Sequence, residues 1–136
     1  MVNYTPKILK SKDKQTNQDT NVSVRDLMSK AFDFLRPDDL ILEAQEKILN
    51  QDLSGVPVVD INHDLVGFLS ERDCLSRVID MKYHNDISNK VKEIMSKKCF
   101  TIKEDENFMK AIEVFSKENI YILTVVNSKN KVVGIL

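Results

Sequence analysis

The chain has 136 residues, enough for one domain with a real hydrophobic core, and its 42% hydrophobic and 30% charged residues are typical of a soluble globular protein. Its net charge of −1 gives no electrostatic reason to expect nucleic acid or an anionic membrane as a partner. No apolar run approaches the roughly 20 residues that a membrane-spanning helix requires, and the N-terminus lacks the apolar core of a secretory signal. These properties predict a cytoplasmic protein.

Residues 1–21 are predicted to form a flexible polar tail, because they are nearly free of large apolar side chains. The segments that follow alternate between helical and strand patterns, with apolar residues three or four apart in the helices and continuous apolar runs in the strands. In chain order the first set comprises a helical turn (24–28), an extended piece (32–36), a helix (37–51), two strands joined by a polar turn (55–60 and 65–69) and a helix (71–83).

A second set of elements follows in the same order, at 91–95, 99–103, 104–118, 122–127 and 131–136. Each long helix is expected to bury one apolar face, and Asp38 or Asp39 is expected to cap the first of them. The apolar faces consist of Ile41, Ala44, Ile48 and Leu49 in one helix and of Phe108, Ala111, Ile112 and Phe115 in the other.

An internal repeat is the strongest signal in the sequence. VRDLMSK aligns with VKEIMSK, which begins 67 residues later, and the match continues at this offset until Leu136 falls on Leu69. We therefore predict an α+β domain of two β-α-β-β-α repeats, residues 22–85 and 86–136, in pseudo-twofold packing with clefts between them. Because the chain reaches only the equivalent of Leu69, the second repeat is expected to lack its final helix.

Ser70 and Asp73, between the last strand and the last helix of the first repeat, have the spacing of a capping box. The same pair could hold a ligand, because an ionised aspartate accepts hydrogen bonds from both hydroxyls of a ribose. The two interpretations do not exclude each other. Arg72 is either a phosphate ligand beside the anion-favouring helix N-terminus or a solvated surface arginine.

The sequence shows little that predicts catalysis or metal binding. Its two cysteines and two histidines are far apart, which predicts neither a disulfide nor a metal site. Cys74 lies near a helix N-terminus, where a thiol pKa can fall, but no histidine is near it in sequence to act as a base. Burial is therefore predicted for Cys74, and similarly for Cys99. Without a Gly-rich phosphate loop or a catalytic dyad, an enzyme is the least favoured hypothesis.

The element order and several motifs resemble the CBS domain, and two such repeats in tandem resemble the CBS pair, or Bateman module, of small stand-alone bacterial proteins. The resemblance covers about residues 22–136 and implies a non-catalytic regulatory module. It would bind an adenosine-containing ligand (AMP, ADP, ATP or S-adenosylmethionine) between the repeats. The resemblance is carried by Val24 to Met28, Pro37, Asp38, Ala44, Gly55 to Asp60, Gly67 to Ser70 and Asp73.

The resemblance also implies which residues hold the ligand. Ser70 and Asp73 would hold the ribose. The base pocket would be formed by Phe34, Leu35, Val56 and Pro57, with Thr101, Ile102, Leu123 and Thr124 as the second-repeat equivalents. Pro57 removes a ladder donor, which places it at a sheet edge or beside a cleft. Either its carbonyl is free to face a base, or Pro57 simply belongs to a plain edge strand.

Two residues depart from the family pattern. Phe34 stands where the family often has the threonine that Thr101 supplies in the second repeat, and its ring could stack on a base or fill the pocket. Thr124 stands where the first repeat has Pro57, which puts a second equivalent pocket in question.

The leading hypothesis is an adenine-nucleotide sensor that forms a homodimer and regulates an unknown protein. The nucleotide is its regulatory ligand, and no obligatory cofactor or metal is expected. The alternative is a structural homodimerisation module with degenerate, ligand-free pockets, which the departures at Phe34 and Thr124 favour.

Overall fold

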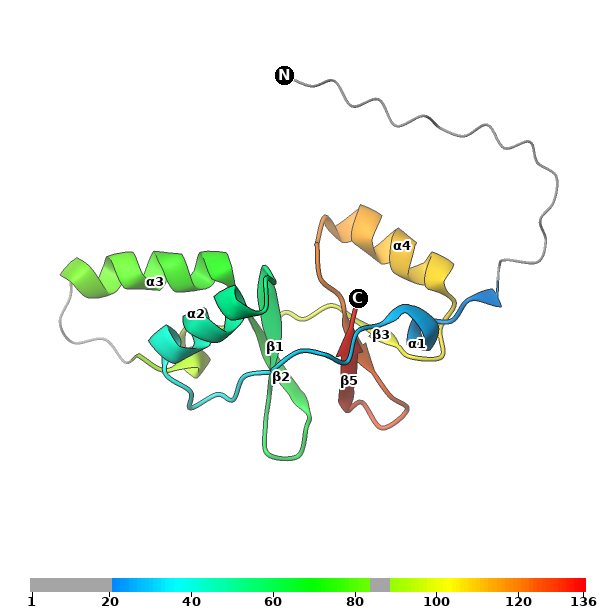
Figure 1. Cartoon of the computed structure of the whole chain (residues 1–136), viewed down its shortest axis with the longest axis horizontal. Coiled ribbons are helices and arrows are strands. Elements are labelled where there is room, and N and C mark those ends of the chain that lie inside the picture. The colour runs from blue at the N-terminus through cyan, green and yellow to red at the C-terminus, as the bar shows by residue number, and fades with distance from the viewer. Residues whose placement is uncertain (1–20, 84–88) are drawn as a thin grey trace, which may run out of the picture.

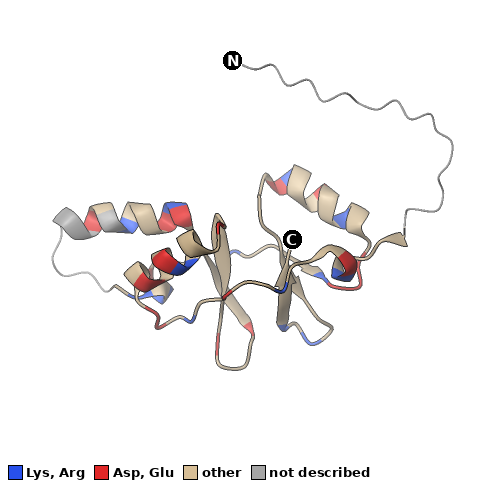
Figure 2. Ribbon diagram, in the orientation of Figure 1, with Lys and Arg blue, Asp and Glu red and all other residues tan. Residues whose placement is uncertain are grey.

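The computed structural model describes residues 21–83 and 89–136, so all but the last residue of the tail expected at 1–21 lies outside this part (Figure 1). Two α+β halves stand side by side. The helices α2 (Ile41–Asn50), α3 (Glu71–Tyr83) and α4 (Phe108–Glu118) lie toward one side of the molecule, and the hairpin turns lie toward the other. Acidic and basic residues are interspersed over both halves (Figure 2). None of the helices in the described part is both long and apolar enough to cross a bilayer.

The first half follows the predicted order of elements with one exception. It contains α1 (Val24–Leu27), α2 (Ile41–Asn50) and the antiparallel strands β1 (Gly55–Val59) and β2 (Leu65–Ser70), followed by α3. The extended piece expected at 32–36 is not a strand here. Only Leu35 pairs with the sheet, through one parallel bridge to Val58.

The second half contains a three-stranded sheet. A short 3₁₀ turn, η2 (Val91–Glu93), precedes β3 (Thr101–Lys103), α4 (Phe108–Glu118), β4 (Thr124–Val126) and β5 (Val132–Ile135). The strand order is β3-β4-β5, with β3 parallel and β5 antiparallel to β4. Asn107 caps α4 by accepting a hydrogen bond from the amide of Met109 at 2.8 Å.

Two local predictions for the long helices are wrong. The N-cap of α2 is Leu40 and not an aspartate, because Asp39 accepts a hydrogen bond from the Arg36 amide (2.8 Å) while Asp38 pairs with Lys92 (3.1 Å). That ion pair lowers the pKa of Asp38. Leu49 and Ile112, expected in the core, are 53% and 43% exposed because they lie at the edge of each apolar face. Ile41, Ala44, Ile48 and Ala111 are buried as expected.

The segment at the start of each half, residues 24–29 and 91–96, packs on the core of the other half, and we call it the leading segment. Val24 joins the core formed by α4 and the second sheet, whereas Val91 joins the core formed by α2, β1 and β2. The amide and carbonyl of Ser29 pair with Ile135 (2.8 and 3.0 Å), and those of Ser96 pair with Phe68 (2.8 and 2.9 Å). The same backbone pairing therefore recurs 67 residues apart, and each half is incomplete without the other.

Two glycines allow this close approach. A Cβ atom on Gly67 would lie 2.4 Å from the Met95 sulfur, and one on Gly134 would lie 2.7 Å from the Met28 sulfur. Each methionine belongs to a leading segment and each glycine to the last strand of the opposite half. A side chain at either glycine would force the packed segments apart.

Candidate ligand-binding site

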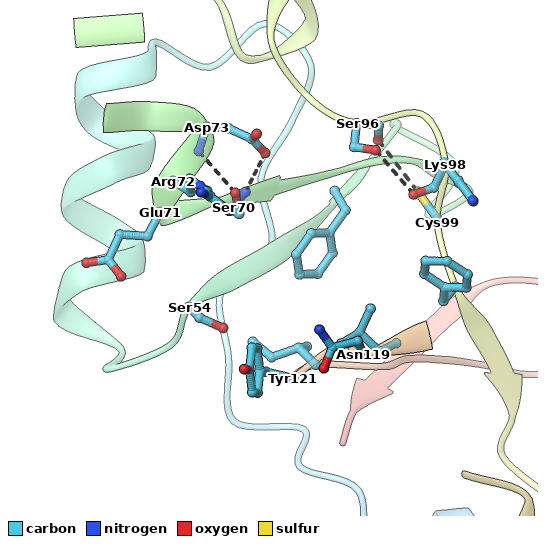
Figure 3. Close-up of a pocket in the computed structure, with 14 residues that line it drawn as sticks. Ser54, Ser70, Glu71, Arg72, Asp73, Ser96, Lys98, Cys99, Asn119 and Tyr121 are labelled. Atoms are coloured by element: carbon cyan, nitrogen blue, oxygen red, sulfur yellow. Dashed lines mark hydrogen bonds between the residues drawn. The ribbon is translucent and has the colours of Figure 1, made fainter. Parts of the chain in front are cut away.

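A cleft of about 440 Å³ lies between the two halves, and we call it the interrepeat cleft (Figure 3). One wall comes from Ser54, which directly precedes β1, from β2 and from the N-terminus of α3. The other comes from the segment that precedes β3 and from the segment between α4 and β4. The lining residues are Ser54, Phe68, Ser70, Glu71, Arg72, Asp73, Ser96, Lys98, Cys99, Phe100, Asn119, Ile120, Tyr121 and Ile122.

Ser70 and Asp73 form the capping box at the start of α3. The amide of Asp73 donates to Ser70 Oγ, and the amide of Ser70 donates to Asp73 Oδ2, both at 3.0 Å (Figure 3). The capping interpretation is confirmed. It leaves room for a ligand, because a carboxylate has about four lone-pair sites and one capping bond uses a single one. The cap also holds the hydroxyl and the carboxylate in place at the edge of the cleft.

The opposite wall adds polar groups that the sequence analysis did not single out for ligand binding. Ser96 Oγ donates to the Lys98 carbonyl at 3.3 Å, and the Cys99 thiol donates to the Ser96 carbonyl at 3.8 Å. The Lys98 ammonium lies 5.4 Å from the centre of the Phe100 ring, within cation–π range. Lys98 and Arg72 therefore place a positive charge on each wall of the cleft.

Three aromatic side chains contribute to the apolar surface of the cleft, together with Ile120 and Ile122. Phe68 comes from β2, while Phe100 and Tyr121 come from the second half. Gly55 leaves space for one of these rings, since a Cβ atom there would lie 2.6 Å from Phe68 Cε1. Tyr121 is 82% exposed and stands at the mouth of the cleft. Flat rings on both walls suit a planar ligand such as a heteroaromatic base.

The two thiols differ in their surroundings. Cys74 is fully buried, as predicted, and burial together with Asp73 and Glu71 raises its pKa to about 11. Cys99 is only partly buried and lines the cleft, and burial raises its pKa too. Neither thiol is activated as a nucleophile by a lowered pKa. Among the described residues, no group of three or more His, Cys, Asp or Glu side chains could hold a metal ion.

The other residues assigned to a base pocket lie away from the interrepeat cleft. Leu35, Val56, Leu123 and Thr124 are buried in the two cores. The Pro57 carbonyl is not free, because it accepts a hydrogen bond from the Leu35 amide at 3.1 Å. The N–H that Pro57 lacks leaves no backbone group unpaired on the neighbouring strand. Phe68, the residue opposite Pro57 on β2, pairs its amide and its carbonyl with Ser96 instead.

Phe34 and Thr101 lie near the hairpin turns. The Phe34 ring packs edge-on against His63, with centroids 4.9 Å apart, and beside a buried cluster of Val59, Val126 and Val132. It therefore fills space between the halves, one of the two roles considered for it. Thr101 is exposed beside a shallow hollow near Asp64. Of the predicted site residues, the structure brings Ser70, Arg72 and Asp73 together at the cleft.

A second hollow of about 530 Å³, which we call the apolar groove, lies between the same two halves. Tyr121 and Ile122 line both hollows. No charged side chain of the described residues lines the groove. Its lining residues are Leu27, Ser29, Ala31, Leu53, Phe108, Phe115, Tyr121, Ile122, Ile135 and Leu136.

The fold therefore belongs to a class of proteins built from two paired α+β repeats that enclose a cleft, here with the capping pair Ser70 and Asp73 at its edge. The model of the CBS domain family matches residues 24–80 and 91–136. The chain therefore belongs to the CBS domain family and carries two CBS domains in tandem.

In the curated relatives that this chain matches, the matching region is part of a longer protein. An uncharacterized protein of Methanocaldococcus jannaschii is 33% identical over 116 residues, which cover 85% of this chain and 37% of that protein. Inosine-5'-monophosphate dehydrogenase of the same organism is 33% identical over 100 residues, 74% of this chain and 19% of the enzyme. This chain thus spans well under half the length of the first curated relatives it matches.

A solved structure shows the same fold with ligands bound. It is the CBS domain pair of protein MJ0100 in complex with 5'-methylthioadenosine and S-adenosyl-L-methionine. The likeness has a TM-score of 0.73 at 28% identity and covers 85% of this chain and 88% of that one.

Proposed function

We propose that this chain is a regulatory sensor that binds an adenosine-containing ligand in the interrepeat cleft. The main observation that supports this proposal is the position of Ser70 and Asp73. Their capping bonds hold them in place, and they line a cleft whose other wall belongs to the second repeat. The MJ0100 pair, which has the same fold and was solved with two adenosine-containing ligands, supports the proposal.

The ribose would lie at the N-terminus of α3. An ionised Asp73 accepts hydrogen bonds only, which suits the two donor hydroxyls of a ribose, and Ser70 Oγ adds a further polar contact. A phosphate would lie near Arg72, where the helix N-terminus also favours an anion, with Lys98 on the facing wall. These two cations favour AMP, ADP or ATP over S-adenosylmethionine, which carries a positive sulfonium and no phosphate.

The base would lie among Phe68, Phe100 and Tyr121. These rings replace the base pocket expected from the family resemblance, because Leu35, Val56, Pro57, Leu123 and Thr124 lie outside the cleft. A ligand held this way touches both repeats, which we propose to be related by a pseudo-twofold axis. Its binding would therefore shift the packing between them, which is how the module would regulate a partner protein.

We further propose that the chain acts in the cytoplasm as a homodimer without catalysis of its own. The second candidate, a structural homodimerisation module, is favoured by one observation: the apolar groove offers a ligand no charged side chain from the described residues. The two candidates differ in one measurable property, which is whether a nucleotide binds.

Isothermal titration calorimetry with AMP, ADP, ATP and S-adenosylmethionine tests the proposal. We expect Asp73→Asn to weaken binding about tenfold or more, because it removes a charge-assisted hydrogen bond while keeping an acceptor for the cap. Asp26→Asn is the matched control, since Asp26 forms the same kind of cap with the Ser23 amide (3.2 Å) at the start of α1, outside the cleft. No heat and no thermal shift with any of these ligands at millimolar concentration would support the structural module instead.

A further inference from the structure

Asn119 is the residue that ends α4, and its side chain lines the interrepeat cleft. Its backbone is in the left-handed region (φ 53°, ψ 46°), and its amide donates to the Phe115 carbonyl at 3.1 Å. Glycine and asparagine are the residues that most readily adopt this conformation after a helix. The backbone therefore restricts the choice of residue at position 119, but it does not require a side-chain amide there.

The equivalent residue of the first repeat, 67 residues earlier, has the same backbone and different chemistry. Asp52 is also left-handed (φ 59°), but it lines neither the interrepeat cleft nor the apolar groove. An ionised carboxylate only accepts hydrogen bonds, whereas an amide both donates and accepts them. The repeat that presents this position to the cleft is therefore the one that has the amide.

The Asn119 side chain is available to a ligand. It is exposed, and its amide group makes no hydrogen bond with any of the described residues. Figure 3 shows it with Tyr121 on the wall of the cleft that faces Ser70 and Asp73. Among the described residues that line the cleft, Asn119 has the only amide side chain. A free donor and a free acceptor held side by side suit a ligand that presents both in the same plane.

Two helix ends of opposite polarity meet at the cleft, the N-terminus of α3 and the C-terminus of α4. A helix N-terminus favours an anion, and a helix C-terminus favours a group with partial positive charge, such as an amino N–H. The charged side chains of the last turn of α4, Lys117 and Glu118, cancel in sign, and neither lines the cleft. The end of the cleft at Asn119 therefore suits an amino group better than a phosphate.

We propose that Asn119 is the residue that selects adenine, with Oδ1 accepting from the 6-amino group and Nδ2 donating to the ring nitrogen N7. Asparagine pairs with this edge of adenine in nucleic-acid recognition, whereas guanine presents two acceptors there. The inference rests on the proposed function and adds the residue that reads the base. It also gives the direction of the ligand, with its phosphate at the start of α3 and its amino group at the end of α4.

Calorimetry of the full chain with AMP and with purine riboside 5′-monophosphate, which lacks the 6-amino group, tests the assignment. We expect the wild type to bind AMP about fivefold more tightly, because the second ligand leaves Asn119 Oδ1 without its donor. In Asn119→Gly the two affinities should become nearly equal. Glycine adopts the left-handed conformation without strain, so the thermal unfolding midpoint of this variant should stay close to that of the wild type.

Asn130→Gly is the matched control. Asn130 is also left-handed (φ 61°), but it lies in the turn between β4 and β5, outside the cleft, so its replacement should leave the ratio of the two affinities unchanged. If Asn119→Gly binds AMP with the wild-type preference, or if the wild type binds both ligands equally, the role of Asn119 is overturned and the sensor proposal stands. If the wild type binds neither ligand, both proposals are contradicted.

Discussion

The interrepeat cleft and the apolar groove are enclosed by the same two repeats, yet they offer different chemistry. At the 67-residue offset, Lys98 in the cleft corresponds to Ala31 in the groove, and Phe68 corresponds to Ile135. Ser54 in the cleft corresponds to Tyr121, which reaches both hollows. The cleft also includes the N-terminus of α3, where the Asp73 carboxylate accepts a capping hydrogen bond from the Ser70 amide. A repeated fold therefore supplies two hollows, and the side chains at equivalent positions decide which one can hold a polar ligand.

The largest effect is expected in the core beneath the cleft. Leu69 is fully buried directly before Ser70, whereas its repeat equivalent Leu136 is partly exposed. Leu69→Ala should lower the free energy of unfolding by about 2–5 kcal/mol, because it removes buried methyl groups and leaves a cavity. Leu136→Ala should have a smaller effect. Urea denaturation of both variants measures the difference, and equal losses would contradict the asymmetry between the two halves.

An intermediate effect is expected from the cations of the cleft. Arg72→Ala and Lys98→Ala should each weaken AMP binding about fivefold to tenfold, because each removes an attraction to the phosphate. Binding of adenosine, which has no phosphate, should change little. Calorimetry with both ligands separates the contribution of the phosphate to binding from that of the nucleoside. Ala31→Lys, which adds a lysine to the groove at the position equivalent to Lys98, is the control and should not change either affinity. An equal loss for adenosine and AMP would place the phosphate elsewhere.

A further effect concerns pH and the buried thiol of Cys74, behind the cleft. The pKa of Cys74 is raised from 9.0 to about 11, mainly by burial, so between these pH values the unfolded chain binds fewer protons than the folded one. The contribution of Cys74 to the free energy of unfolding is therefore present below pH 9 and lost as pH rises toward 11. Cys74→Ala removes this dependence. Urea denaturation midpoints measured from pH 8 to 11 should show that the difference in stability between the wild type and Cys74→Ala shrinks as pH rises. A constant difference over this range would contradict the link between Cys74 ionisation and folding.

Much of the fold could be predicted from the sequence because its signals are local or repeated. The 67-residue offset, the apolar faces of α2 and α4 and the buried strand β1 all follow from residues near one another in the chain or from direct comparison of two segments. The packing of each leading segment on the core of the opposite half could not be predicted in this way. Val24 and Val91 show an apolar residue in each leading segment, but not that each one packs on the other repeat.

The candidate site shows the same division. The sequence contains the spacing Ser-x-x-Asp with an arginine before the aspartate at 23–26 as well as at 70–73, and both pairs form a cap hydrogen bond. A cap depends on atoms three residues apart, so the sequence by itself determines it. Only the tertiary structure decides that Ser70 and Asp73 face Lys98, Phe100 and Tyr121 across a cleft while Asp26 lines none of the hollows described here. Those facing residues are brought together by the packing of two repeats, which no local spacing encodes.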